Sequence, residues 1–211
     1  MSLQRLKYFY PYILGLLPIL IFVALARLVI KNETYKLDLD INFWVSKLRT
    51  PFWTEVMKIV SDIGAIGGVF VIGFVCTYLF LHKKINILVG LLICSLGATL
   101  FTVFLKILTA RNRPELVNRL VVESGFSFPS GHATTAFIAF PVTAIIIYFN
   151  PKIPKLFKIL CVSILSIFPF IVAFSRLYLG VHYFSDVVAG AMVGLTATCV
   201  FYYLMSKSKY D

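Results

Sequence analysis

The chain has 211 residues, of which 60% are hydrophobic and only 14% are charged, and its mean hydropathy is +0.91. This composition nearly excludes a soluble single-domain enzyme, and it also excludes disorder, collagen and coiled coil. The net charge of +11 would elsewhere suggest nucleic acid. Here the basic residues stand in short clusters between apolar runs, which favours membrane lipid headgroups and phosphate-bearing substrates as partners instead.

Several apolar segments reach or approach the ~20 residues that a bilayer-spanning helix needs. They are residues 12–30, 64–81, 85–105, 133–149, 159–174 and 187–205. We therefore expect an all-α, polytopic membrane protein, a six-transmembrane-helix bundle that forms a single domain over residues 1–211. The cysteines, Cys76, Cys94, Cys161 and Cys199, fall inside these segments. They are predicted to be small buried hydrophobic residues rather than a disulfide framework or a metal cluster.

The stretch from Asp38 to Asp62 differs from the spans around it. Charged residues interleave with apolar ones at spacings of mainly three or four, and both tryptophans, Trp44 and Trp53, lie in it. This pattern predicts amphipathic interfacial helices between the first two spans, capping one mouth of the bundle. The alternative is a simple linker.

Basic residues mark the predicted termini and the even-numbered connections. They are Arg5, Lys7, Lys83, Lys84, Lys152, Lys155, Lys158, Lys207 and Lys209. The positive-inside rule places these segments, and so both termini, in the cytoplasm. The sequence Ala24-Leu25-Ala26 also resembles a signal-peptide cleavage site, but apolar character resumes after Arg27. An uncleaved first span is therefore favoured.

Three polar clusters stand at the opposite ends of the predicted spans. The first contains Lys106 and Arg113-Pro114, the second is Pro129-Ser130-Gly131-His132, and the third contains Ser175-Arg176, His182 and Asp186. A lone cation at a span end is more often a lipid anchor. Two histidines, three cations and a carboxylate on one side exceed what anchoring requires.

The residue types in these clusters suit phosphoryl transfer. Lys106, Arg113 and Arg176 can stabilise charge spread over the equatorial oxygens of the transition state. Ser130 fits a helix N-cap, and the amides of Gly131 and His132 after it form a natural anion site. His132 could then protonate a departing oxygen.

His182 and Asp186 are spaced i and i+4, which places them on one face if the last helix begins near Val181. A carboxylate bonded to one imidazole nitrogen fixes the tautomer and raises the basicity of the other nitrogen, as a nucleophilic histidine requires. The pair fits covalent catalysis through phosphohistidine. The structural alternative is a helix-stabilising pair at the membrane edge.

Together the three motifs resemble the signature of the type-2 phosphatidic acid phosphatase superfamily, membrane lipid phosphatases related to the vanadium haloperoxidases. Six residues separate Lys106 from Arg113-Pro114, five separate Arg176 from His182, and three separate His182 from Asp186. Tyr178 and Gly180 also fit the third motif, with Gly180 as the bend into the last helix.

This resemblance implies a role for each matched residue. His182 is implied as the nucleophile, Asp186 as its partner, and His132 as the general acid that later helps to activate water. The phosphate would be held by Lys106, Arg113, Ser130, Gly131 and Arg176. Family members work without a metal, so no metal and no other cofactor is expected.

We therefore predict a membrane phosphatase that hydrolyses a lipid phosphate or pyrophosphate at the outer face of the plasma (inner) membrane. Similarity to small bacterial members makes undecaprenyl pyrophosphate the first choice, with phosphatidylglycerol phosphate and phosphatidic acid open. Headgroup preference is expected to reside in the loop 115–128 and in the interfacial segment. The alternatives are a lipid phosphotransferase that uses an alcohol acceptor, a non-enzymatic lipid-phosphate binder, and a metal-dependent hydrolase with His132, His182 and Asp186 as ligands.

Overall fold

The computed structural model describes residues 3–207 and, among them, the side chains of residues 15–115 and 117–206. This part of the chain is helical, without strands. Its α-helices are α1 (Leu3–Ile30), α2 (Tyr35–Ser46), α3 (Pro51–Asp62), α4 (Gly68–Leu81), α5 (Ile85–Thr109), α6 (Gly131–Phe149), α7 (Lys155–Tyr178) and α8 (Phe184–Lys207). A π-helical turn, Ile63–Gly67, joins α3 to α4, and a 3₁₀ turn, Leu116–Asn118, lies between α5 and α6.

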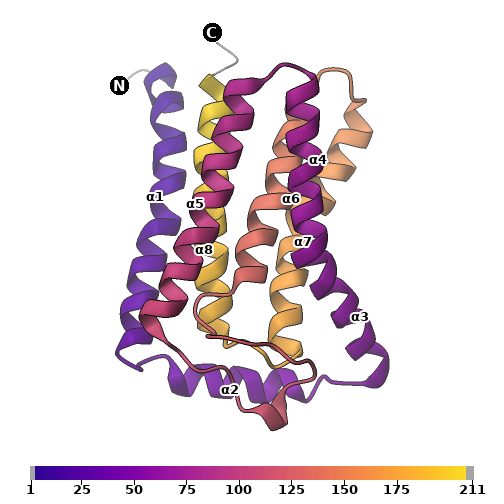
Figure 1. The fold of residues 1–211 in the computed structure, drawn as a ribbon. Coiled ribbons are helices and arrows are strands. Elements are labelled where there is room, and N and C mark those ends of the chain that lie inside the picture. Colours follow the sequence, from indigo (N-terminus) through magenta and orange to yellow (C-terminus); the bar gives the residue numbers. More distant parts are fainter. Residues whose placement is uncertain (1–2, 208–211) are drawn as a thin grey trace.

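The long helices stand side by side, with α6 packed mainly against α7 and α8, and α8 also against α1 and α5 (Figure 1). Within the described residues, 5 helices are long and apolar enough to cross a membrane, and a sixth span results if the bent pair α1 and α2 is counted as one. The all-α, six-span membrane architecture is therefore confirmed. Both ends of the described chain lie at the end of the bundle opposite α2.

The segment expected at the interface forms two helices, of which one lies across the end of the bundle and the other continues into a span. α2 turns away from α1 by 99° and lies across one end of the bundle, with Asp38 and Val45 buried and Trp44 exposed. α3 begins at Pro51 and runs through the π-helical turn directly into α4. The second span therefore starts earlier than residue 64, because the π turn continues the helix instead of ending it.

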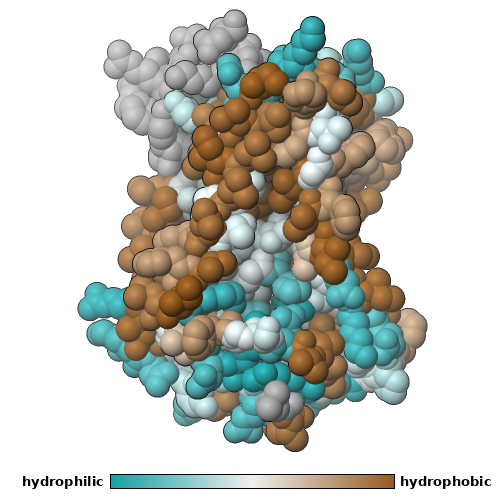
Figure 2. Space-filling view, in the orientation of Figure 1, coloured by the Kyte–Doolittle hydropathy of each residue, from teal (hydrophilic) through white to brown (hydrophobic). Residues whose placement is uncertain are grey.

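The surface of the bundle is apolar along the helices and polar at the end that carries α2 (Figure 2). Large side chains such as Phe70, Phe74 and Ile93 are more than half exposed, as expected where lipid takes the place of a protein neighbour. The cysteines share this environment. All of them are free and lie in helices, where they are half-buried within the bundle.

Gly180 makes the bend between α7 and α8 that the sequence predicts. Its φ is +71°, and a Cβ atom there would collide with the Asn118 carbonyl oxygen and lie 2.7 Å from Arg49 Nη2. Only glycine accepts this backbone conformation at little cost. The turn that carries His182 therefore depends on the absence of a side chain at this position.

We expect Gly180→Ala to destabilise the fold by more than the ~1–2 kcal/mol of a left-handed backbone, because the new methyl group also collides with the loop 115–128. Thermal unfolding in detergent measures the effect. Gly73→Ala is the matched control, since nothing lies within 4 Å of a Cβ atom there and the change in a helix interior should stabilise by about 0.5–1 kcal/mol. A melting temperature for Gly180→Ala at or above that of the parent would contradict this view of the bend.

Candidate active site

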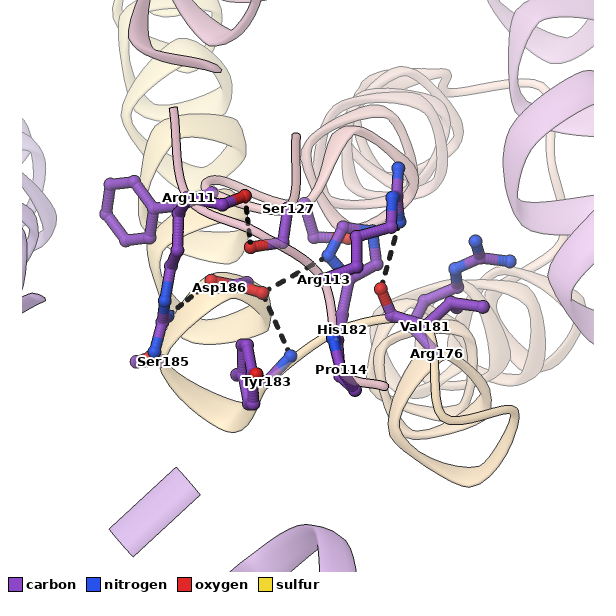
Figure 3. Close-up of polar contacts among 12 residues, drawn as sticks. Arg111, Arg113, Pro114, Ser127, Arg176, Val181, His182, Tyr183, Ser185 and Asp186 are labelled. Atoms are coloured by element: carbon purple, nitrogen blue, oxygen red, sulfur yellow. Dashed lines mark hydrogen bonds and ion pairs between the residues drawn. The ribbon is translucent and has the colours of Figure 1, made fainter. Parts of the chain in front are cut away.

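The predicted site residues meet at the end of the bundle that carries α2. They come from the last turn of α5, the loop 110–130, the first turn of α6, the end of α7 and the turn into α8. Two segments far apart in the sequence, residues 106–132 and 175–186, thus form one polar region (Figure 3).

His182 and Asp186 contact each other, but not as neighbours on one helix. Because α8 begins at Phe184, His182 lies in the turn before it, and the expected helical i, i+4 pair was wrong in its geometry. The Asp186 carboxylate reaches back over the first turn, and its Oδ2 accepts a hydrogen bond from the Tyr183 amide at 2.9 Å. The same oxygen lies 3.4 Å from His182 Nδ1.

Arg113 approaches the edge of the imidazole that carries Nε2, away from the Nδ1 edge that faces Asp186. Its Nη1 donates to the Val181 carbonyl at 2.9 Å and lies 3.2 Å from His182 Nε2. Carbonyl groups of Gly125 and Ser124 hold its Nε and Nη2, each at 3.0 Å. With a carboxylate at Nδ1 and a guanidinium donor at Nε2, the favoured neutral tautomer carries its proton on Nδ1 and leaves the Nε2 lone pair facing the cations.

Arg176 is the most deeply buried cation of the site, with 2% of its surface exposed. It donates to the Ser61 hydroxyl and to the Glu123 carboxylate. Its Nε is buried and finds no hydrogen-bond partner among the described residues. A buried donor without an acceptor is costly in a folded protein, which is consistent with a site that a ligand completes.

Lys106 and the start of α6 complete the polar region. Lys106 Nζ donates to the Phe126 carbonyl at 2.6 Å. Ser130 is the predicted N-cap: its Oγ accepts from the Ala133 amide at 3.5 Å, and its own amide donates to the Asp186 carbonyl at 2.9 Å. The first amides of α6, at Gly131 and His132, have no acceptor within their own helix. Nothing lies within 4 Å of a Cβ atom at Gly131, so a ligand has room to approach.

Glu123, which the sequence did not single out, lies among these cations. Its carboxylate pairs with Arg176 and lies 3.7 Å from Arg113 Nη2 and 3.8 Å from His132 Nε2. Burial alone would raise the pKa of Glu123, but Arg176, by charge and hydrogen bond, and then His132 and Arg113 hold it below its usual value. The carboxylate therefore occupies the place expected for a phosphate group.

Burial and the same cations keep His182 neutral. Burial lowers its pKa well below the usual value, and the positive charges of Arg176, Arg113 and Lys106 lower it further. Burial and the charge of Arg176 likewise lower the pKa of Arg113, against the opposing effect of Glu123. At neutral pH the buried imidazole is thus an unprotonated base beside several cations.

Two further residues escaped the sequence analysis. Arg111 lies between the carboxylates of Asp186 and Asp38, at 2.6 and 2.7 Å. Arg111 stands two residues before Arg113, but no spacing distinguishes it from a surface cation. Asp38 was counted among the polar residues of an amphipathic segment, although it is fully buried.

An apolar helical bundle that gathers cations around a buried imidazole at one end has the features of a membrane protein that handles a phosphate-like anion. Residues 87–210 match the PAP2 superfamily, and the chain belongs to this superfamily. It is 32% identical over 179 residues to phosphatidylglycerophosphatase B of Bacillus subtilis, covering 83% of this chain and 87% of the relative. It is 25% identical to lipid A 4'-phosphatase of Bacteroides thetaiotaomicron, over 81% of this chain and 78% of that protein.

Solved structures agree with the family assignment. The crystal structure of a transmembrane PAP2-type phosphatidylglycerolphosphate phosphatase from Bacillus subtilis superposes with a TM-score of 0.81 at 28% identity, covering 93% of this chain and 96% of that one. LpxE of Aquifex aeolicus shares the fold, with a TM-score of 0.61 at 23% identity over 78% of this chain and 94% of that one. The chain is therefore a membrane lipid phosphatase, a hydrolase of phosphate esters from a family without metal dependence.

The alternative of a metal-dependent hydrolase has no ligand set in the part of the chain that the structure describes. No three His, Cys, Asp or Glu side chains are gathered there as a metal ion would require. His132, His182 and Asp186 share the polar region, but arginine and lysine side chains stand around them.

Because the Glu123 carboxylate competes for the cations, Glu123→Gln should strengthen inhibition by inorganic phosphate and by orthovanadate. An inhibition constant about tenfold lower corresponds to roughly 1.4 kcal/mol of relieved competition. Glu115→Gln is the matched control, since Glu115 lies in the same loop and is exposed. Inhibition constants that are unchanged or higher in Glu123→Gln would show that the carboxylate does not compete with the anion.

The depressed pKa of His182 also predicts a pH dependence of stability. In the unfolded chain a histidine binds a proton below about pH 6.5, whereas the folded site resists protonation, so the stabilising contribution present above that pH is lost as the pH falls. In detergent, the melting temperature of His182→Gln should fall less between pH 7.5 and 5.5 than that of the parent. His82→Gln, which removes an exposed imidazole at the other end of the bundle, should retain the parental fall. An equal fall in His182→Gln would contradict the assignment.

Proposed function

We propose that the protein hydrolyses a lipid phosphate or pyrophosphate through a phosphohistidine intermediate on His182. The observation that carries the proposal is the two-sided environment of the imidazole. Nδ1 faces the Asp186 carboxylate at 3.4 Å, and Nε2 faces the Arg113 guanidinium at 3.2 Å. A neutral imidazole oriented in this way presents a lone pair to a phosphorus atom held by the cations.

In the first step, the Nε2 lone pair attacks phosphorus and the bond from phosphorus to the lipid oxygen breaks. His132 gives a proton to that oxygen, and Asp186 accepts a hydrogen bond from Nδ1–H, which now belongs to a cationic ring. In the second step, water attacks phosphorus, His132 takes the water proton, and the bond from phosphorus to nitrogen breaks. Phosphate leaves, and His182 returns to its neutral form.

The phosphate oxygens would lie among Lys106, Arg113, Arg176, the Ser130 cap and the amide of Gly131. These groups combine guanidinium forks, an ammonium group and a helix N-terminus, which stabilise charge that develops during transfer. Binding requires Glu123 to move out of this place. The free Arg176 Nε then gains the acceptor that it lacks in the described residues.

The choice of lipid rests on the relatives. One similar protein is named a phosphatidylglycerophosphatase and another a lipid A 4'-phosphatase, so phosphatidylglycerol phosphate stands beside undecaprenyl pyrophosphate as a candidate. Both lipids present a terminal phosphate on a long apolar anchor. The loop 115–128, which contributes Glu123 to the site, is where the headgroups would be distinguished.

We further propose that the whole chain is one phosphatase domain in the plasma (inner) membrane, with its site at the outer face. Lys83, Lys84, Lys152 and Lys155 are exposed at the end of the bundle opposite the site, and the positive-inside rule assigns that end to the cytoplasm. Arg5, Lys7, Lys207 and Lys209 belong to the same argument but lie outside the described side chains.

Phosphate release from a panel of lipid phosphates and pyrophosphates in liposomes tests the function. We expect release in excess chelator, no turnover in His182→Ala, and a loss of at least ~10²-fold in His132→Ala. A phosphoryl group on His182, labile to acid and stable to base, should accumulate in His132→Ala if the activation of water becomes slow.

Unchanged turnover in purified His182→Ala would refute the nucleophile, and headgroup binding without phosphate release would favour a binder. Product analysis with added alcohols separates hydrolysis from phosphotransfer. His82→Ala is a control for the loss of an imidazole outside the site.

A further inference from the structure

A second charged network lies directly behind the imidazole and is separate from the phosphate-facing cations. Arg111 Nη1 donates to Asp186 Oδ1 at 2.6 Å and to Ser185 Oγ at 2.7 Å, and its Nη2 donates to Asp38 Oδ2 at 2.7 Å. Its guanidinium also lies 4.4 Å from the centre of the Tyr183 ring. Both carboxylates are fully buried, and only 12% of the Arg111 side chain is exposed.

This network divides the two oxygens of the catalytic carboxylate between two tasks. Arg111 holds Oδ1, while Oδ2 accepts from the Tyr183 amide and faces His182 Nδ1 (Figure 3). A carboxylate free to rotate about its side-chain bonds could turn either oxygen toward the imidazole. The bond to Arg111 fixes the plane in which Oδ2 meets Nδ1.

Asp38 supports the same arrangement from a different element. Its Oδ1 accepts from the Ser185 amide at 2.9 Å, and its Oδ2 accepts from the Ser185 hydroxyl at 2.6 Å as well as from Arg111. Ser185 is in the first turn of α8, whose amides have no acceptor within the helix. Asp38 therefore anchors α2 to the turn that carries Asp186.

We propose that Arg111, in the loop after α5, and Asp38, on the buried face of α2, are positioning residues for phosphoryl transfer, which together hold Asp186 Oδ2 against His182. The inference rests on the proposed nucleophilic role of His182. It adds α2 to the machinery of the reaction, although α2 contributes no group to the phosphate.

Arg111 is not a further phosphate ligand, because both of its amino groups are already bonded to carboxylates. Although burial alone would lower it, the pKa of Arg111 is raised above its usual value by Asp186 and Asp38. Arg113 and Arg176, in contrast, share one carboxylate, that of the displaceable Glu123. Loss of Arg111 should therefore impair the chemical step more than anion binding.

The test compares Arg111→Gln, Arg111→Lys and Asp38→Asn with Asp40→Asn, a control on the same helix with an exposed carboxylate. We expect kcat to fall by ~10²-fold in Arg111→Gln, the scale of a small misplacement of a catalytic group, and by about tenfold in Asp38→Asn. KM and the inhibition constant for orthovanadate should change less than about threefold, because a substitution that does not interact with the anion site should leave anion binding nearly unchanged. Arg111→Lys should fall between the parent and Arg111→Gln, because an ammonium group keeps the charge but cannot bridge both carboxylates.

A double-mutant cycle with Asp186→Asn separates positioning from general stability. If Arg111 acts through Asp186, Arg111→Gln should have little further effect on kcat in the Asp186→Asn background. Any of three results would overturn the proposal. They are an undiminished ~10²-fold loss of kcat in the Asp186→Asn background, a loss of orthovanadate affinity in Arg111→Gln as large as its loss of kcat, and parental kcat in the single variants. If Arg111→Gln does not fold, Arg111→Lys and Asp38→Asn decide by the same criteria.

Failure of the positioning role can be distinguished from failure of the proposed function. Turnover that survives in His182→Ala would remove the nucleophile, whatever the Arg111 variants do. Loss of turnover in His182→Ala together with parental kcat in the Arg111 and Asp38 variants would remove only the positioning role.

Discussion

Burial of charge at one end of an apolar bundle is the constraint that organises this protein. Arg113, Arg176 and Lys106 are drawn out of water, and isolated buried cations are strongly unfavourable. The chain balances them with Glu123 on the phosphate side, while Asp186 and Asp38 hold Arg111 behind the imidazole. The two systems meet at His182, which contacts Arg113 through one nitrogen and Asp186 through the other.

Loops and α2 enclose this end of the bundle with polar groups that the apolar helices alone lack. The loop 110–130 crosses the bundle end, and its carbonyl groups at Gly125, Ser124 and Phe126 satisfy donors of Arg113 and Lys106. Gly180 allows the turn into α8 to pass close to this loop. α2 closes the remaining side. The cations are thus oriented by backbone dipoles before any ligand arrives, which is the condition for electrostatic stabilisation of a transition state.

The sequence predicted the parts of this arrangement that follow from hydropathy and motif spacing. Spans, the cap at Ser130 and the gathering of the three motifs are of this kind, because each depends on local pattern or on residues with distinctive chemistry. The roles of Glu123, Asp38 and Arg111 depend on which distant side chain each one meets, and a charged residue in a loop or amphipathic helix carries no mark of its partner. The continuous helix from Pro51 to Leu81 was missed for a different, local reason: glycine-rich residues 64–68 suggest a break, whereas the π turn carries the helix through them.

The internal carboxylate also bears on which ligands the site can accept. A ligand must offer the cations more than Glu123 does, and it must compensate the repulsion among Arg113, Arg176 and Lys106 once Glu123 has moved away. A terminal phosphate with close to two negative charges and three acceptor oxygens meets that demand, whereas a phosphodiester in a bulk membrane lipid offers one charge spread over two oxygens. Under the proposed function, displacement of Glu123 would therefore let the site discriminate monoesters from the diesters that vastly outnumber them in a bilayer. Specificity would then come from competition within the chain as well as from contacts with the lipid.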